Sequence, residues 1–144
     1  MPLQINDTLI QRALAVLRIV SAFLLVQHGT AKHLGFPHVA SFDNLATFSL
    51  VGVAGLLEIV GGVLLLIGLF TRPVAFVLSG LLAFAYFIGH APRGNVLSPM
   101  LNGGESAVLF CFVFLFLAVA GAGSWSVDAM RAPPRYRGLT GAPR

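Results

Sequence analysis

The sequence predicts an all-α membrane protein, a four-transmembrane-helix bundle with both termini in the cytoplasm. First, 57% of its 144 residues are hydrophobic and only 10% are charged, whereas a soluble domain usually carries about 25% charged residues. Second, four apolar runs are separated by short polar segments, and a bilayer core about 30 Å thick needs roughly 20 helical residues to cross. Third, these runs are too long and too uniformly apolar for the alternating strands of a membrane barrel.

The first predicted helix covers residues 9–32, follows a short polar lead and ends in the polar run Gln27 to His33. We expect it to remain attached as a spanning helix. Its basic residues lie late in the segment, and no Ala-x-Ala site follows the apolar stretch, so it does not match a cleavable signal peptide. In the loop that follows, apolar residues recur at spacings of about three, which favours a short interfacial helix.

The second predicted helix covers residues 50–70, with Glu58 as its only charge. Thr71-Arg72-Pro73 is expected to end it, because proline breaks a helix but is tolerated at the start of the next one. The third helix is predicted over residues 74–90 and the fourth over residues 105–120.

Residues 1–128 are predicted to form one membrane domain. Residues 129–144 lack an apolar pattern and are predicted to be a mobile cytoplasmic tail.

The distribution of arginine and lysine predicts the orientation. With four spans, both termini and the turn at residues 71–73 share one side, which carries Arg12, Arg72, Arg131, Arg135 and Arg137. The other side carries Lys32 and Arg93. Positive charge concentrates in the cytoplasm, so the loops at 33–49 and 91–104 are expected to face outward. A multi-pass protein of the bacterial inner membrane is the expected location.

Ionisable groups at or within the predicted spans carry most of the functional information, since each costs roughly 2.5–3.5 kcal/mol in a bilayer. They are Arg18, His28, Lys32, Glu58, His90 and Glu105. All except Arg18 are expected in the outer half of the bundle. Two histidines and two carboxylates on four helices could form a pocket for a polar headgroup, a quinone ring or protons.

Helical spacing predicts which way these groups point. Arg18, His28 and Lys32 lie close to one face of the first helix. Glu58 shares a face with Gly55 and Gly62, and small residues let a neighbouring helix approach closely, so Glu58 is expected to face a neighbour. Gly80, Ala83, Phe87 and His90 are expected to form a comparable face of the third helix. Simpler readings stay open: Glu58 could neutralise Arg18 or Lys32, the basic residues could snorkel, and Glu105 could cap a helix.

Several function classes are excluded by the residues that are missing. A single cysteine, Cys111, cannot form a disulfide, a CxxC pair or a cysteine-rich metal site within the chain. The net charge of +4 is carried by basic residues that stand singly, which does not indicate a nucleic-acid surface. No nucleophile elbow, P-loop or dinucleotide-binding motif occurs, and no metal site is predicted.

The chain resembles the DoxX family of small four-helix membrane proteins over about residues 10–128. The resemblance rests on the order of His28-Gly29-x-x-Lys32, Glu58-x-x-Gly61-Gly62, Gly68-Leu69-Phe70-Thr71-Arg72, His90 and Asn102-Gly103-Gly104-Glu105. It implies a membrane bundle with an oxidoreductase role, since some members are the membrane subunit of a thiosulfate:quinone oxidoreductase and others are linked to thiol and oxidative-stress complexes. The family positions found here are His28, Lys32, Glu58, Arg72, His90, Asn102 and Glu105.

The first hypothesis is therefore a quinone-linked oxidoreductase subunit in the lipid bilayer, with a partner redox protein or as a homo-oligomer. His28 and His90 would hydrogen-bond quinone carbonyls while Glu58 relays protons. Lys32, Arg18, Asn102 and Glu105 would complete the ligand-binding cluster, with Glu105 also relaying protons. The alternatives are a non-enzymatic scaffold that recruits a redox partner, a small transporter that needs oligomerisation, and a haem held by the two histidines.

Overall fold

The computed structural model of the chain describes residues 7–132 and is all-α over that range, without a β-strand among the described residues. The long helices are α1 (Asp7–His33), α2 (Leu50–Ile67), α3 (Thr71–Ala85) and α5 (Glu105–Ala120), and the short helices are α4 (Pro99–Asn102) and α6 (Val127–Arg131). The remaining turns are η1 (Ala40–Phe42), the π-helical η2 (Tyr86–His90) and η3 (Ala91–Arg93). The predicted all-α class is confirmed.

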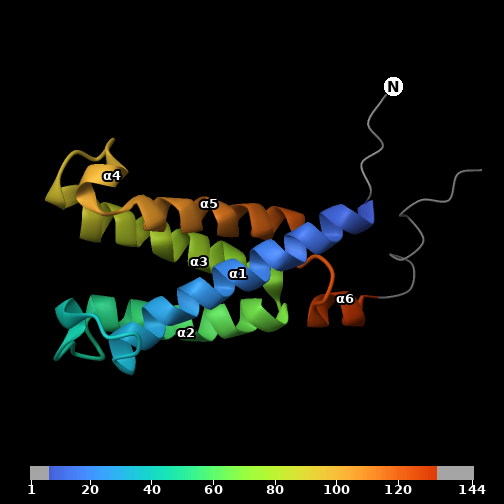
Figure 1. Cartoon of the computed structure of the whole chain (residues 1–144), viewed down its shortest axis with the longest axis horizontal. Coiled ribbons are helices and arrows are strands. Elements are labelled where there is room, and N and C mark those ends of the chain that lie inside the picture. Colours follow the sequence, from blue (N-terminus) through green and yellow to red (C-terminus); the bar gives the residue numbers. More distant parts are fainter. Residues whose placement is uncertain (1–6, 133–144) are drawn as a thin grey trace, which may run out of the picture.

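The four long helices run lengthwise in two pairs (Figure 1). α1 packs mainly against α2, and α3 packs mainly against α5. Residues 34–49 and α4 lie at one end of the bundle, which we call the loop end. The start of α1, the α2–α3 turn and α6 lie at the opposite end, which we call the terminal end (Figure 1).

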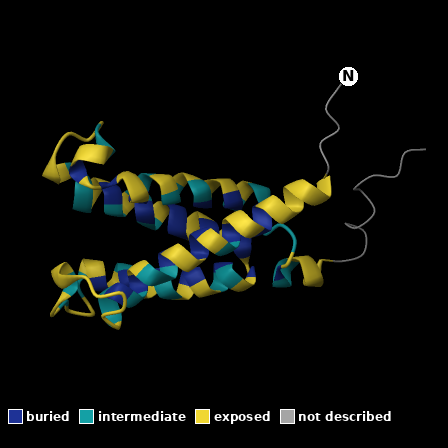
Figure 2. Ribbon diagram, in the orientation of Figure 1, coloured by how far each residue is buried: buried dark blue, intermediate teal, exposed yellow. Residues whose placement is uncertain are grey.

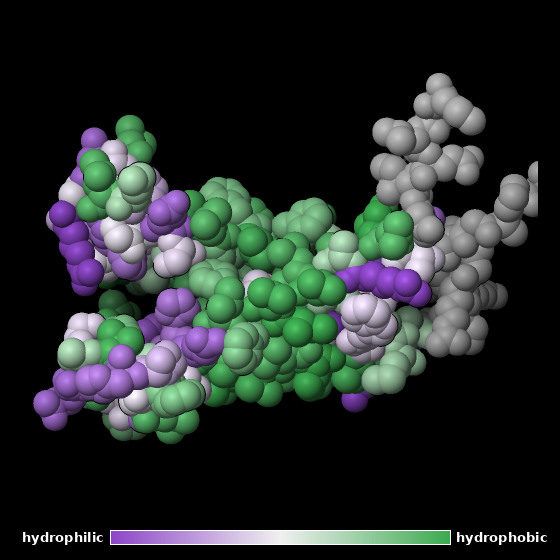
Figure 3. Space-filling model, in the orientation of Figure 1, coloured by the Kyte–Doolittle hydropathy of each residue, from purple (hydrophilic) through white to green (hydrophobic). Residues whose placement is uncertain are grey.

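The outer surface of the bundle is apolar. Buried residues face the neighbouring helices, whereas much of the outer face is exposed (Figure 2). In the space-filling view, a hydrophobic band separates hydrophilic side chains at the two ends (Figure 3). Three helical segments are long and apolar enough to cross a membrane: Asp7–His33, Leu50–Ile67 and Thr71–Arg93. The fourth apolar helix, α5, is shorter, with 16 residues.

The core between the helices consists of aliphatic and phenylalanine side chains: Leu14, Ala22, Leu25, Leu65, Ala75, Leu78, Leu82, Phe114 and Leu117. Glycines bring α1 and α2 together, as the face of Gly55, Glu58 and Gly62 predicts, and all three residues are buried. A methyl group on Gly29 of α1 would lie 2.7 Å from the carbonyl oxygen of Gly55. The close approach therefore depends on small residues on both helices.

The turn between α2 and α3 lies three residues earlier than the sequence predicts. α2 ends at Ile67 and not at residue 70, because Gly68 adopts the left-handed conformation that ends a helix (φ 69°). α3 begins at Thr71 and not at residue 74, so Pro73 lies within its first turn. Proline is stable there because the first N–H groups of a helix have no intrahelical partner.

Two further expectations differ from the structure. The buried face of α3 consists of Thr71, Ala75, Leu78, Ser79 and Leu82, whereas the predicted face through Gly80 and Phe87 is exposed. Part of the loop is expected to form an interfacial helix, and it contains the single turn η1.

The predicted domain boundary at residue 128 falls within α6. Residues 133–144 of the predicted tail lie outside the described residues.

Candidate functional site

A buried ion pair joins α1 to α2 in the half of the bundle nearer the loop end. Lys32 Nζ lies 2.7 Å from Oε1 and 2.6 Å from Oε2 of Glu58. The two side chains are only 11% and 5% exposed. Gly55, one turn before Glu58, makes room for the lysine, since a methyl group there would lie 3.0 Å from Lys32 Cδ. The sequence left Arg18 and Lys32 open as partners of Glu58, and the structure assigns Lys32.

The loop that follows α1 covers this pair. The ring of Phe42, in η1, has its centroid 5.8 Å from Lys32 Nζ, within the range of a cation–π interaction. His33 Nε2 lies 2.8 Å from the carbonyl oxygen of Gly52 in the first turn of α2. Sequence reasoning did not select His33 or Phe42. Two features of the sequence could have indicated them: His33 is adjacent to Lys32, and Phe42 is an aromatic residue in the loop that follows.

His28 lies one helical turn before Lys32 on α1. Its side chain is exposed, and its ring stands edge-on to that of Phe110 on α5, with centroids 5.8 Å apart. It is close enough to Glu58 and Lys32 to interact electrostatically with both. Three of the predicted site residues, His28, Lys32 and Glu58, therefore lie together, with an aromatic ring of the opposite helix pair beside them.

The other predicted residues of the loop end form a separate group. Asn102 is buried and donates from Nδ2 to the Tyr86 hydroxyl (3.1 Å) and to the Asn95 carbonyl (3.2 Å), while Oδ1 accepts from Gly104 N–H (2.9 Å). The Tyr86 hydroxyl in turn donates to the Val96 carbonyl (2.6 Å). Asn102 thus fixes the connection between α3 and α5. Within residues 7–132, no hydrogen bond or ion pair links this group to Lys32 or Glu58.

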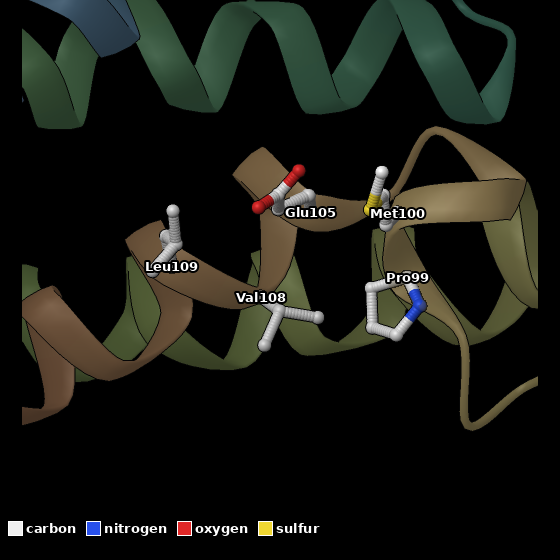
Figure 4. Close-up of a pocket in the computed structure, with 5 residues that line it drawn as sticks. All are labelled: Pro99, Met100, Glu105, Val108 and Leu109. Atoms are coloured by element: carbon white, nitrogen blue, oxygen red, sulfur yellow. The ribbon is translucent and has the colours of Figure 1, made fainter.

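His90 and Glu105 flank this connection. His90 Nδ1 is buried and has no hydrogen-bond partner among the described residues. Glu105 is exposed at the start of α5 and lines a shallow pocket of about 230 Å³ with Pro99, Met100, Val108 and Leu109. In Figure 4 the Glu105 carboxylate and the Met100 side chain project toward the side on which α2 lies, and Val108 projects away from it.

Arg18 lies apart from these residues, toward the terminal end. It is completely buried and donates to backbone carbonyl groups alone: Leu65 and Leu66 of α2 (2.7 Å for Leu66), Ala122 (2.9 Å) and Trp125 (2.9 Å). The guanidinium thereby satisfies carbonyl groups at the end of α2 and holds the segment after α5 against it. Arg18 is placed as a structural clamp and not beside Glu58.

Asp128 also lies at the terminal end, and sequence reasoning assigned it no role. Its carboxylate accepts from the N–H groups of Phe70 (2.9 Å) and Thr71 (2.8 Å), and its own N–H donates to the Gly68 carbonyl (2.9 Å). A carboxylate at the N-terminus of α3 is favoured by the helix dipole. The feature of the sequence that could have indicated a helix here is Ser126, whose hydroxyl oxygen accepts from Ala129 N–H (3.1 Å) and so caps α6.

Among residues 7–132, no group of three or more His, Cys, Asp and Glu side chains is placed to hold a metal ion. Cys111 is a free thiol in α5, with its sulfur 3.5 Å from the hydroxyl of Ser79.

Comparison with known proteins gives the family. The DoxX family matches residues 13–91, from the second turn of α1 to the first residue of η3. A Haemophilus influenzae protein described as uncharacterized is 48% identical over 117 residues, which cover 80% of this chain and 87% of that protein. No solved structure matches the chain. The family match, the similar protein and the apolar helices confirm the resemblance: the chain is a membrane protein of the DoxX family.

Proposed function

We propose that α5 is a fourth span and that both termini face the cytoplasm of a bacterial cell. The start of α1 and helix α6 lie at the same end of the bundle, as an even number of spans requires (Figure 1). Arg12, Arg72 and Arg131 lie on this terminal end, whereas the loop end carries Arg93 and Lys32, whose charge is compensated by Glu58. A cytoplasmic terminal end agrees with the positive-inside rule.

A fluorescent protein that folds only in the cytoplasm tests this orientation. Fused to the C-terminus, it is expected to fluoresce, and a phosphatase active only outside the cytoplasm is expected to be inactive there. The same phosphatase inserted between α3 and α4 is expected to be active. Phosphatase activity at the C-terminus would contradict the proposal.

We further propose that the protein is the membrane subunit of a quinone-linked oxidoreductase, with the quinone bound beside His28. The observation that carries this proposal is the buried Lys32–Glu58 pair next to an exposed histidine that contacts the aromatic ring of Phe110. Buried charges within membrane helices mark proton pathways and ligand sites more often than lipid contacts. A bound quinone would supply two-electron chemistry coupled to proton uptake.

The residues present fit such a ligand. The exposed imidazole of His28 has a ring N–H to donate to a carbonyl oxygen, and histidine is suited to proton transfer near neutral pH. Phe110 and its stacked neighbour Phe114, with ring centroids 5.8 Å apart, provide an apolar wall for a planar ring. Glu58 and Lys32 lie near enough to His28 to interact with it electrostatically, so the pair would influence proton transfer at the imidazole.

Binding is tested by thermal unfolding of the purified protein with a short-chain benzoquinone and with a naphthoquinone. We expect one of them to raise the unfolding midpoint of the wild type, and His28→Ala to abolish that rise. His38→Ala is the matched control, because His38 is an exposed loop histidine paired with Asp43 (3.1 Å). The proposal fails if neither quinone shifts the midpoint or if His28→Ala responds as the wild type does.

A membrane scaffold that recruits a redox partner is the second candidate. It is favoured by large apolar side chains exposed at the loop end, among them Phe36, Phe48, Leu97, Met100 and Leu101. Exposed apolar patches of this kind mark interaction sites. Under this function, Glu58→Gln would leave co-purification of the partner intact, whereas Phe48→Ser would reduce it. Loss of quinone-linked turnover in Glu58→Gln protein that is still folded and still co-purifies with the partner would argue for the oxidoreductase instead.

A further inference from the structure

A second pocket, which has polar residues in its lining, lies at the terminal end, away from His28. It has a volume of about 450 Å³ and is formed by the first turns of α1 and α3 together with the segment after α5. The residues that matter for its chemistry are Gln11, Thr71, Arg72, Gly121 and Asp128. No part of the proposed quinone site contributes to it.

Arg72 provides the charge of this pocket. Its Nη1 donates to the carbonyl groups of Val119 (2.6 Å) and Ala118 (3.4 Å) at the end of α5. Within residues 7–132 its side chain forms no other hydrogen bond and no ion pair, so the edge formed by Nε and Nη2 has no protein partner there. This is the edge with which arginine binds oxyanions through two parallel hydrogen bonds.

Gly121 keeps that edge accessible. Its φ of 96° is a conformation that favours glycine, and a methyl group here would lie 3.3 Å from Nη2 and 3.5 Å from Nε of Arg72. A methyl group would therefore touch the two donors that face the pocket, whereas glycine leaves them open.

Thr71 supplies a second, independent indication of a ligand. It lines the pocket and is 1% exposed, yet its hydroxyl oxygen has no hydrogen-bond partner among the described residues. An unpaired buried hydroxyl is unfavourable, and an added acceptor oxygen would relieve this.

The acidic residue of the pocket, Asp128, forms no ion pair with Arg72 in the described structure. The carboxylate of Asp128 is occupied by two N–H groups of the α3 N-terminus and interacts electrostatically with Arg18. The pocket thus retains one unpaired cation, at the boundary between the apolar band and the polar end. Phe70 and Val119, exposed by 58% and 71%, continue from it along the apolar surface of the bundle.

We propose that this pocket binds a phosphate group, and that the phosphate belongs to an anionic phospholipid. Nε and Nη2 of Arg72 would donate to two phosphate oxygens, and the Thr71 hydroxyl would donate to one of them. The acyl chains would lie along the apolar surface next to Phe70 and Val119. A phospholipid is favoured over a free phosphate ion because this apolar surface begins at the pocket, and Arg131 at the same end adds attraction for an anionic membrane surface.

The test uses the full chain in a neutral detergent, titrated with phosphatidylglycerol, with phosphatidylcholine or with inorganic phosphate, and followed by its thermal midpoint. Phosphatidylglycerol is expected to raise the midpoint of the wild type more than the other two additions. Arg72→Gln is expected to weaken the apparent affinity for phosphatidylglycerol about tenfold, which corresponds to the loss of one charge-assisted contact. Arg12→Gln, an exposed arginine of the same end outside the pocket, is expected to bind as the wild type does.

Three outcomes would overturn the proposal. Equal weakening by Arg72→Gln and Arg12→Gln would indicate general surface attraction. An equal effect of phosphatidylcholine would remove the preference for an anionic headgroup, and an equal effect of inorganic phosphate would identify a free-anion site. If Arg72→Gln does not fold, Arg72→Lys decides, because lysine keeps the charge and can still reach the α5 carbonyl groups. It lacks the planar two-donor edge, so unchanged lipid affinity in Arg72→Lys would refute the bidentate contact.

Discussion

Replacing Arg18 by methionine is expected to lower the free energy of unfolding by about 3–5 kcal/mol. Methionine has a similar length and is apolar, so the change removes the donors while leaving the site filled. Of the four carbonyl groups that accept from Arg18, that of Leu65 also accepts from Gly68 N–H (3.0 Å). Those of Leu66, Ala122 and Trp125 would lose their described donor.

The magnitude follows from these three carbonyl groups. An unsatisfied buried acceptor costs about 1–3 kcal/mol, and because these three hydrogen bonds are only partly buried, their loss lies in the lower part of the resulting range of about 3–9 kcal/mol. Burying a guanidinium is itself unfavourable by several kcal/mol, and its removal recovers part of that amount. The net loss therefore falls near the lower end of the range.

Reversible unfolding by SDS in mixed micelles measures this loss, and Trp125 is a built-in probe, being the single tryptophan of the chain and an acceptor of Arg18. We expect the emission of Trp125 to change in the folded variant as well, because the segment after α5 is released. Arg12→Met, an exposed arginine on the same helix, is the control and should change stability by less than about 0.5 kcal/mol. A loss below about 1 kcal/mol for Arg18→Met, with unchanged emission, would refute the clamp.

Further predictions concern the contact between α1 and α2, with the same unfolding assay. Glu58→Gln and Lys32→Met should each destabilise the protein by about 3–5 kcal/mol, because each leaves a buried partner charge uncompensated, and combining Lys32→Met with Glu58→Leu should restore most of the loss. If the single variants are as stable as the wild type, the pair is not buried in solution. Gly29→Ala should destabilise by about 1–3 kcal/mol, since its methyl group would lie 2.6 Å from an Ile59 side-chain carbon and 2.7 Å from a backbone oxygen. Gly80→Ala, with nothing within 4 Å, should be neutral or stabilising by up to about 1 kcal/mol, and a comparable loss in both variants would contradict a glycine-dependent contact.

The sequence predicted the helical segments and the inward direction of Glu58 because both are local properties. Composition and run length identify apolar helices, and a carboxylate flanked by small residues is unfavourable in lipid. Which basic residue pairs with Glu58 depends on the relative position of α1 and α2. Arg18 and Lys32 share one stripe but are about 21 Å apart along the helix axis, so one carboxylate cannot bind both.

The buried face of α3 was missed because the prediction followed the small residues Gly80 and Ala83, whereas the buried face carries the hydroxyl residues Thr71 and Ser79. In a membrane helix the polar residues, more than the apolar ones, mark the side that faces protein. The π-helical turn at Tyr86–His90 also changes the phase of the helix before His90. Gly80 resembles a packing glycine in sequence, yet it is exposed.

The role of Asp128 was missed for another reason. α6 has five residues, too few for a periodic pattern, and its attachment consists of hydrogen bonds to residues far away in the sequence. Contacts of this kind leave no local signal.

The shortness of α5 has a consequence for the surrounding lipid. Sixteen helical residues span about 24 Å, whereas the hydrocarbon core of a bilayer is about 30 Å thick. If α5 is a span, the difference of about 6 Å has to be absorbed by thinning of the bilayer along this side or by apolar side chains that extend the helix. Leu97, Met100 and Leu101, highly exposed beside the start of α5, lie where such an extension is needed. Hydrophobic mismatch on one side of the bundle would favour lipids with short acyl chains there. It would also favour association of that side with other membrane proteins.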